Sequence, residues 1–326
     1  MEKTDIITKK PLYFFLHIPK TGGTTINQGL VSNHKDGEVI FLGKDLLGNK
    51  TSKNEIKKYL NSIPADKKKI IKVITGHAVY YGLHEIFPER EPRYIACFRH
   101  PVTLTISSYN YNLGLLKKSN FNFPDASTQE LYDAKTLTFE EALFKYGNSL
   151  NSTFKFLVSR LFNDNYLNDE DCFFSNESEN KILLKKIKER LSHFYFLGIT
   201  EKSQDDFLFI ADKLGITKYM PRENISTKFF SLTDNLLIKD NIQKFNLLDQ
   251  NLYDYALSIN NKYKQNNPDF NLSVKKMNKM FILNLVIDMF NIKHYPQNIY
   301  RFSNFLKQKS KKYALLVKLI KNLLPH

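Results

Sequence analysis

The sequence predicts an α/β domain in which helices flank a central, mostly parallel sheet. Continuous apolar runs are the first observation behind this fold class, because such runs are typical of strands buried on both faces of a parallel sheet. Their positions are 11–18, 69–75, 93–99 and 194–200. The second observation is that segments of helical periodicity separate these runs, and strands alternating with helices are the pattern of an α/β fold.

The predicted helices lie between and after these strands, at 22–32, 101–116, 138–162, 178–192 and 201–214. The last is the clearest, because Ser203 can cap its start, acidic residues fill its first turn and Gly215 can end it. A polar segment that contains Pro124, residues 117–136, is predicted to be a surface excursion.

The composition is that of a globular protein, since 42% of the 326 residues are hydrophobic and 13% are aromatic. Two cysteines cannot supply a disulfide framework, and Cys97 lies in an apolar strand segment where a reduced, buried thiol is expected. The apolar run near the N-terminus is too short for a secretory signal or a spanning helix. These features predict a cytoplasmic protein.

The net charge of +15 is concentrated near the C-terminus, where residues 271–326 hold eleven lysines and arginines and one acid, Asp288. We therefore divide the chain into a domain at 1–270 and a basic helical extension at 271–326. The extension sets apolar residues beside lysines, so it is either a peripheral helix on the inner face of an anionic membrane or a cap packed on the domain. Nucleic-acid binding is not expected, because no recognition motif accompanies the charge.

The segment YFFLHIPKTGGTTINQGL is a strand that passes through a glycine turn into a helix. Gly22 and Gly23 allow backbone N–H groups to face an anion, and the start of the helix adds its positive end. Thr24 and Thr25 supply hydroxyl donors, and Lys20 supplies a mobile charge. Because the lysine precedes the glycines, the segment differs from the G-x-x-x-x-G-K-[ST] loop that holds nucleoside triphosphates. It predicts a site for a phosphate-like anion, and a plain tight turn is the alternative.

The segment YIACFRHPVTLTISSYNY is a second strand, turn and helix. Arg99 ends the predicted strand, at the position where α/β proteins place ligand contacts. Ser107 follows eight residues later, two turns into the helix. A forked guanidinium and a hydroxyl suit a second phosphate group. The alternative is that Arg99 pairs with a carboxylate and Ser107 only occupies a helix face.

Together, FFLHIPKTGGTT and FRHPVTLTISSYNY resemble the paired cofactor motifs of carbohydrate sulfotransferases that use 3′-phosphoadenosine 5′-phosphosulfate (PAPS). The heparan sulfate 2-O-sulfotransferase group and its bacterial relatives are the most similar in pattern. The resemblance extends over residues 11–260 and has no counterpart for the C-terminal extension. It implies a P-loop-like sulfotransferase fold, PAPS as co-substrate without a metal, and a glycan hydroxyl as acceptor. A C-terminal helix on the membrane would suit a lipid-linked glycan.

The resemblance also implies roles for individual residues. The loop that would hold the 5′-phosphosulfate consists of Lys20, Thr21, Gly22, Gly23, Thr24 and Thr25. Arg99 and Ser107 would hold the 3′-phosphate, and Lys20 would stabilise the leaving group during in-line attack.

A base must accept the proton of the attacking hydroxyl, and histidine is suited to this near neutral pH. His77, in the segment TGHAVYYGLH, corresponds to a G-H pair of the relatives and is the predicted base, with His84 as the weaker alternative. His17 is expected to be structural, and His100 a spacer after the arginine.

Two other functions compete with this interpretation. A nucleotide or small-molecule kinase would need a lysine after the glycines and an acid for magnesium, and neither is evident. A non-catalytic protein that binds polyanions or membranes would explain the charge but not the two motifs. In the segment LNSTFKFLVSRL, Lys155 and Arg160 are candidates for acceptor contacts, although a solvated helix face is the favoured interpretation.

Overall fold

The computed structural model describes residues 9–43, 52–118, 141, 151–162, 177–218 and 236–290. Within them, five strands form one sheet in the order β2-β3-β1-β4-β5, and every neighbouring pair is parallel. The strands are β1 Pro11–Leu16, β2 Val39–Phe41, β3 Val73–Gly76, β4 Glu91–Phe98 and β5 Phe196–Ile199.

The predicted class, a parallel sheet flanked by helices in a P-loop-like arrangement, is confirmed. The helices are α1 Gly23–Asn33, α3 Lys53–Ser62, α4 Ala65–Ile70, η1 Leu83–Ile86, α5 Pro101–Lys118, α8 Ser152–Leu161, α9 Glu177–Leu191, η4 Thr200–Lys202, α10 Ser203–Lys213, α11 Leu236–Phe245, α12 Leu247–Asn266 and α13 Pro268–Phe290.

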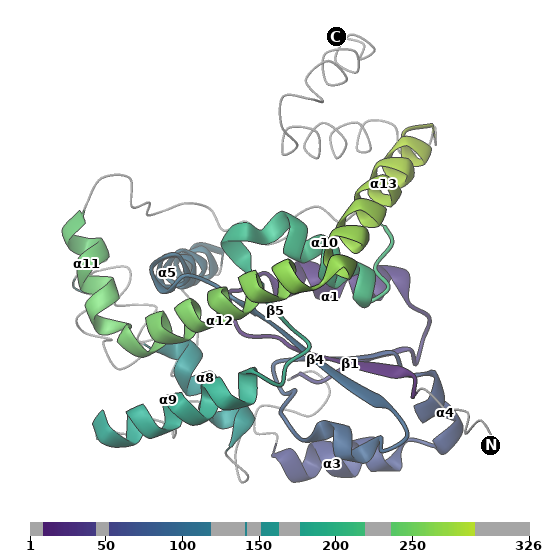
Figure 1. Cartoon of the computed structure of the whole chain (residues 1–326), viewed down its shortest axis with the longest axis horizontal. Helices are drawn as coiled ribbons and strands as arrows, with labels where there is room; N and C mark the ends of the chain where they lie inside the picture. Colours follow the sequence, from purple (N-terminus) through teal and green to yellow (C-terminus); the bar gives the residue numbers. More distant parts are fainter. Residues whose placement is uncertain are drawn as a thin grey trace.

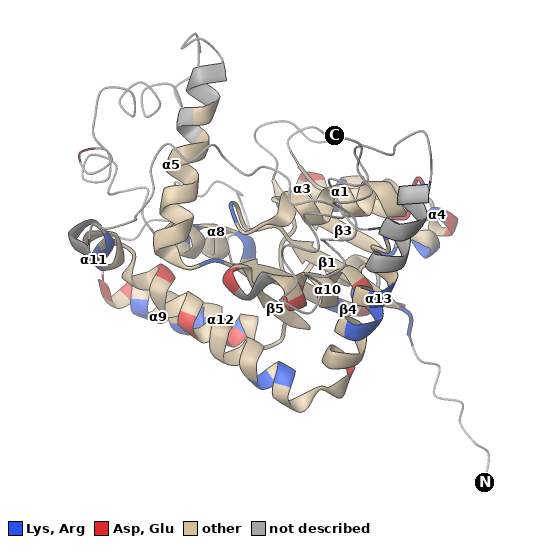
Figure 2. Ribbon diagram, turned by 90° about the horizontal axis from the view of Figure 1, so that it is seen from above, with Lys and Arg blue, Asp and Glu red and all other residues tan. Residues whose placement is uncertain are grey.

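Helices cover both faces of the sheet, which explains why its strands are apolar throughout. In β1, Leu12, Phe14 and Leu16 belong to a core with α3, α8, α9 and α12. The intervening Tyr13 and Phe15 belong to a second core with α1, α10 and α13 on the opposite face. Figure 1 shows α1, α10 and α13 on one side of the strands and α3 and α9 on the other. Figure 2 shows charged residues of both signs along α9 and α12.

Two parts of the sheet differ from the sequence-based expectation. The predicted strand at 69–75 is a short helix, α4, followed by a strand that begins only at Val73. β2 has three residues, too few to produce a recognisable pattern, and was not predicted. Helix α3 was also missed, although its reciprocal capping box between Ser52 and Glu55 is a signal present in the sequence.

The sheet order decides where the predicted motifs meet. β1 lies between β3 and β4, and Leu16 at its end pairs with Gly76 on one side and Ala96 on the other. Because all three strands are parallel, the segments that follow them emerge at the same edge of the sheet. That edge is where ligands bind in open α/β folds.

The proposed division after residue 270 falls inside α13, which begins at Pro268. Phe270, Met277 and Phe281 of this helix are buried in the core that also contains α10. Residues 291–326, most of the predicted extension, and residues 119–140, most of the predicted surface excursion, lie outside the described residues. None of the helices that the structure describes combines the length and apolar character needed to cross a membrane.

Candidate active site

The loop after β1 has a backbone shaped by two left-handed residues. Lys20 has φ 62° and Gly22 has φ 88°, and α1 begins at Gly23. Gly22 is the N-cap of α1, so no side chain caps the amides of the first turn, and a Cβ at Gly22 would meet no atom within 4 Å. A left-handed conformation is unusual for lysine and persists only where the surroundings hold it. The loop therefore presents an open helix start, which suits an anion.

Arg99 joins the two predicted motifs directly. Its Nη1 donates a hydrogen bond of 3.0 Å to the carbonyl oxygen of Lys20, and its Nε donates to Thr103 Oγ1 at 3.2 Å. Directly after β5, at the start of η4, the hydroxyl of Thr200 lies 3.0 Å from the carbonyl oxygens of Thr21 and Phe98. The left-handed loop is thus held from two neighbouring strands. Thr103 and Thr200 were not identified from the sequence.

Lys20 lies under an aromatic ring of α5. Its Nζ is 2.9 Å from the centroid of the exposed Tyr111 ring, which sequence reasoning did not identify. Burial, together with the charge of Arg99, lowers the pKa of Lys20 to about 8. Ser107 lies one turn before Tyr111 on the same helix and is half-buried. Its role with Arg99 in holding a phosphate stays a prediction.

His77 follows β3 and is exposed, and its ring is held by His17. The two rings are stacked, with centroids 4.1 Å apart and planes inclined by 24°. His77 Nδ1 lies 2.7 Å from the carbonyl oxygen of His17. Gly76, just before it, has φ 133° and lies so close to Leu42 that a Cβ would be 2.0 Å from the Leu42 carbonyl oxygen.

His17 is buried, as expected of a structural residue. Its Nδ1 is 3.4 Å from Asn27 Nδ2, and a Cβ on Gly23 would lie 2.0 Å from its Cδ2. Burial, followed by the charges of His77 and Lys20, lowers the pKa of His17 to about 3. His17 is therefore neutral near pH 7 and lies within electrostatic reach of both predicted catalytic groups.

The other two histidines near the motifs are engaged in local contacts. His84 lies in η1, its Nδ1 is 3.1 Å from the Tyr94 hydroxyl, and burial lowers its pKa. His100 is more than a spacer, because its Nδ1 accepts the N–H of Val102 at 3.3 Å at the start of α5. Its own N–H donates to Glu201 Oε1 at 2.9 Å, which ties α5 to η4.

The favoured interpretation of Lys155 and Arg160 as a solvated face is wrong, because both side chains are buried. Every residue of α8 from Thr153 to Leu161 is buried, since α9 and α12 pack on this helix. Arg160 Nε donates a hydrogen bond of 2.6 Å to the carbonyl oxygen of His77. α8 therefore reaches the candidate site through its arginine.

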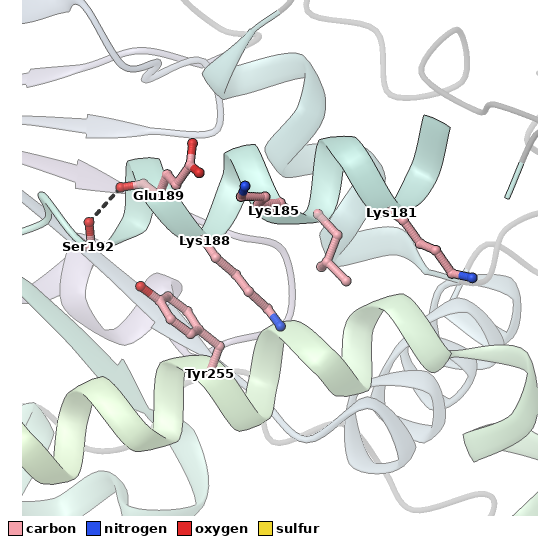
Figure 3. A pocket seen from close by; sticks show the side chains of 7 residues that line it. Lys181, Lys185, Lys188, Glu189, Ser192 and Tyr255 are labelled. Atoms are coloured by element: carbon pink, nitrogen blue, oxygen red, sulfur yellow. Dashed lines mark hydrogen bonds between the residues drawn. The ribbon is translucent and has the colours of Figure 1, made fainter. Parts of the chain in front are cut away.

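The described residues contain no group of three or more His, Cys, Asp or Glu side chains arranged to hold a metal ion. A hollow of about 450 Å³ lies between α9 and α12 (Figure 3). Its lining residues are Lys181, Leu184, Lys185, Lys188, Glu189, Ser192 and Tyr255. None of them belongs to the two motifs, so this hollow is not part of the candidate site.

Comparison with known proteins bears on the chemistry of this site. Over 273 residues the chain is 25% identical to heparan-sulfate 6-O-sulfotransferase 2 from Gallus gallus. The chain is similar to a carbohydrate sulfotransferase. The alignment covers 76% of this chain and 66% of the relative's length, and the relative is a 6-O-sulfotransferase and not a member of the 2-O group. No family model matches the chain.

Proposed function

We propose that the protein transfers a sulfuryl group from PAPS to a hydroxyl of a glycan. One observation carries the proposal: the glycine turn, Arg99 and His77 follow three adjacent parallel strands and emerge at one edge of the sheet. Arg99 also donates a hydrogen bond to the Lys20 carbonyl oxygen, and this contact between the two motifs supports a shared site. The similarity to a protein named as a sulfotransferase supports the same chemistry.

The residues present fit a sulfonated nucleotide. The open helix start at Gly22 and the amides of the loop offer donors to a phosphosulfate, and Lys20 adds a cation beside it. Arg99 and Ser107 would hold the 3′-phosphate. This phosphate group distinguishes PAPS from a nucleoside triphosphate. PAPS would supply the sulfuryl group, and side chains of this chain would accept the proton and neutralise the developing charge.

His77 would accept the proton of the acceptor hydroxyl as the hydroxyl oxygen forms its bond to sulfur. The bond that breaks joins sulfur to the oxygen of the 5′-phosphate, and Lys20 would neutralise the charge that develops on that oxygen. The acceptor gains a sulfate ester and adenosine 3′,5′-bisphosphate leaves. Positioning and charge stabilisation suffice for such a transfer, as for phosphoryl transfer.

The acceptor is proposed to be a glycan, on the strength of the relative's name and of the motifs. We further propose a cytoplasmic protein whose basic extension, beyond α13, contacts the inner face of the membrane and whose acceptor is lipid-linked. These points rest on the sequence alone. Flotation of the full chain with anionic vesicles tests the membrane contact, and a chain that stays unbound to them would contradict it.

Calorimetry with adenosine 3′,5′-bisphosphate in excess chelator tests the nucleotide site. We expect binding without metal, and Arg99→Ala should weaken it by about 2 kcal/mol because a charge-assisted hydrogen-bond donor is lost. Arg93→Ala is the matched control, since Arg93 lies near the opposite end of β4 and pairs with Glu91. Binding that appears only after magnesium is added would favour a kinase, and absent binding would favour a polyanion-binding protein.

Transfer is tested with radiolabelled PAPS and a panel of glycans that includes desulfated heparan sulfate. Incorporation of label into one glycan supports the proposal. Nucleotide binding combined with no transfer to any glycan in the panel would contradict the glycan acceptor.

A further inference from the structure

His77 is held at three points by residues from two other elements. The ring of His17, from the end of β1, stacks on the His77 ring at 4.1 Å. The carbonyl oxygen of His17 contacts His77 Nδ1 at 2.7 Å, and Arg160 of α8 donates to the His77 carbonyl oxygen at 2.6 Å. We propose that His17 and Arg160 are positioning residues, which hold the His77 imidazole in one orientation and one tautomer. The proposal rests on the proposed function, in which His77 is the base.

The contact with the His17 carbonyl decides the tautomer. A carbonyl oxygen can only accept a hydrogen bond, so Nδ1 of His77 must carry the proton that it donates. Neutral His77 then has its lone pair on Nε2, and only that nitrogen can take a proton from an acceptor. A histidine free to exchange tautomers would present the lone pair on Nε2 for only part of the time.

His17 can act as a support because it is itself fixed. The buried hydroxyl of Thr75 donates to Asn27 Oδ1 at 2.8 Å, so the amide nitrogen of Asn27 is directed toward His17 Nδ1 at 3.4 Å. The His17 ring also lies against Gly23, where a side chain would collide with it. Thr75 of β3 and Asn27 of α1 thus set the position of the His17 ring that stacks on His77. Because the same ring lies against Gly23, it also connects His77 to the loop that carries Lys20.

Arg160 supports the segment that contains His77 from the other side. Its guanidinium reaches the His77 carbonyl, and its own carbonyl oxygen accepts the N–H of Tyr81 at 3.1 Å. The guanidinium lies 4.6 Å from the Phe156 ring centroid, and its Nη1 donates to Ser159 Oγ at 2.6 Å. These contacts within α8 keep the guanidinium in place, so the segment from His77 to Tyr81 is held at both ends.

Nitrogen-15 NMR of the histidine side chains tests the proposal without substrate, with His77 assigned by the loss of its signals in His77→Ala. In the wild-type protein above the titration of His77, we expect a protonated Nδ1 and an unprotonated Nε2. In Arg160→Met, in His17→Leu and in Asn27→Leu, which leaves the His17 ring in the chain, the two shifts should move toward a mixture of tautomers. The control is Arg93→Met, because Arg93 also lies over aromatic rings, those of Tyr13 and Tyr195, near the opposite end of β4.

Activity separates positioning from folding. In the three test variants kcat should fall by about tenfold or more, because misplacement of a reacting group is costly. In Arg160→Met, whose change lies on α8, affinity for adenosine 3′,5′-bisphosphate should stay within about twofold. Arg160→Lys and His17→Phe, which keep a donor and a flat ring, should recover part of kcat.

Unchanged His77 shifts in Asn27→Leu and in whichever of the other two variants fold would overturn the positioning roles. A different result would contradict the proposed function instead: the His77 shifts move in the variants, but the wild-type protein transfers no sulfate. The assignment of His17 and Arg160 as supports of His77 would then stand.

Discussion

Lys20 makes nucleotide binding sensitive to pH at the scale of a single residue. Burial and the charge of Arg99 lower its pKa to about 8, so the free protein loses this positive charge as the pH rises through that value. A bound phosphosulfate or phosphate favours the ammonium and raises the pKa again. At a pH between the Lys20 pKa of the free protein and that of the bound protein, nucleotide binding must take up a proton. The affinity for the nucleotide must then decline as the pH rises.

We therefore expect adenosine 3′,5′-bisphosphate to bind more weakly at pH 9 than at pH 7. Calorimetry near pH 8 in two buffers of different ionisation enthalpy should reveal proton uptake. Lys20→Arg is the control, because guanidinium stays protonated throughout this range and the uptake should disappear. Equal proton uptake in the wild type and Lys20→Arg would show that another group titrates.

The two predicted catalytic residues should separate in their kinetics. His77→Ala should lower turnover by roughly 10²–10⁴-fold and leave nucleotide affinity nearly unchanged, because the base acts on the acceptor. Lys20→Ala should reduce both, since in the proposed mechanism Lys20 would contact the nucleotide before and during transfer. His84→Ala is the comparison, because burial and Tyr94 engage that ring. Full activity of His77→Ala with loss of activity in His84→Ala would reassign the base.

Gly22 and Gly23 are adjacent but should respond differently to alanine. A Cβ on Gly23 would lie within 2.6 Å of three His17 ring atoms, so the ring that supports His77 must move. We expect Gly23→Ala to lose about 1–3 kcal/mol in the free energy of unfolding, as overpacked sites do. At Gly22 the space is open and only the left-handed backbone opposes alanine, at about 1 kcal/mol. Chemical denaturation measures the free energy of unfolding of both variants. Equal losses in Gly22→Ala and Gly23→Ala would mean that the His17 ring can move aside without loss of stability.

At the scale of elements, α12 caps α8 and so fixes the helix that carries Arg160. The buried carboxylate of Asp249 accepts the N–H groups of Thr153 and Phe154 at 3.1 and 2.7 Å. At the same junction Asn246 Oδ1 accepts the backbone N–H of Asn151, and Asn151 Oδ1 accepts the backbone N–H of Leu248. The start of α8 is therefore capped by side chains nearly one hundred residues later in the chain.

Burial raises the pKa of Asp249 to about 6, above its value in an unfolded chain. Between about pH 4 and pH 6 the folded protein thus binds more protons at this site, so its contribution to stability declines as the pH rises through that window. Asp249→Asn lacks this titration. The free energy of unfolding of Asp249→Asn minus that of the wild type should therefore increase by about 2 kcal/mol as the pH rises from 4 to 7.

Urea denaturation at the two pH values measures this difference. Asp254→Asn, on the same helix, is the matched control for the loss of a carboxylate. A pH-independent difference between Asp249→Asn and the wild type would mean that the two backbone N–H groups hold the carboxylate ionised throughout.

At the scale of the whole molecule, α13 belongs to the fold of the domain that precedes it. Met277 and Phe281 are almost completely buried in the core with α10, and Lys276 and Ser273 both contact Asp212 of α10. A chain ending at residue 270 loses these contacts and exposes part of the core. A chain ending at residue 290 retains them.

We expect the chain that ends at 270 to be less stable than the one that ends at 290 by at least about 3 kcal/mol, the scale of deleting a large buried side chain. Thermal and chemical denaturation of the two truncated chains measure this. Equal stability would support residue 270 as the end of an independent domain.

The sequence by itself determined the fold class and the two chemical motifs. Continuous apolar runs and glycine turns act over a few neighbouring residues, and such local patterns can be recognised without knowledge of the fold. A parallel sheet then requires the ends of β1, β3 and β4 to emerge at one edge. For this reason the sequence was sufficient to predict that Lys20, Arg99 and His77 follow strands at one edge of the sheet.

Tertiary structure alone decided how these residues are held. Arg160 lies 83 positions from His77, and Tyr111 covers Lys20 from a helix that follows another strand. Contacts of this kind depend on which helix packs on which, and they leave no periodic signal in the sequence. The same reason explains the error at α8: a lysine and an arginine on a helix predict a solvated face, unless partners far along the chain bury them and satisfy their hydrogen bonds.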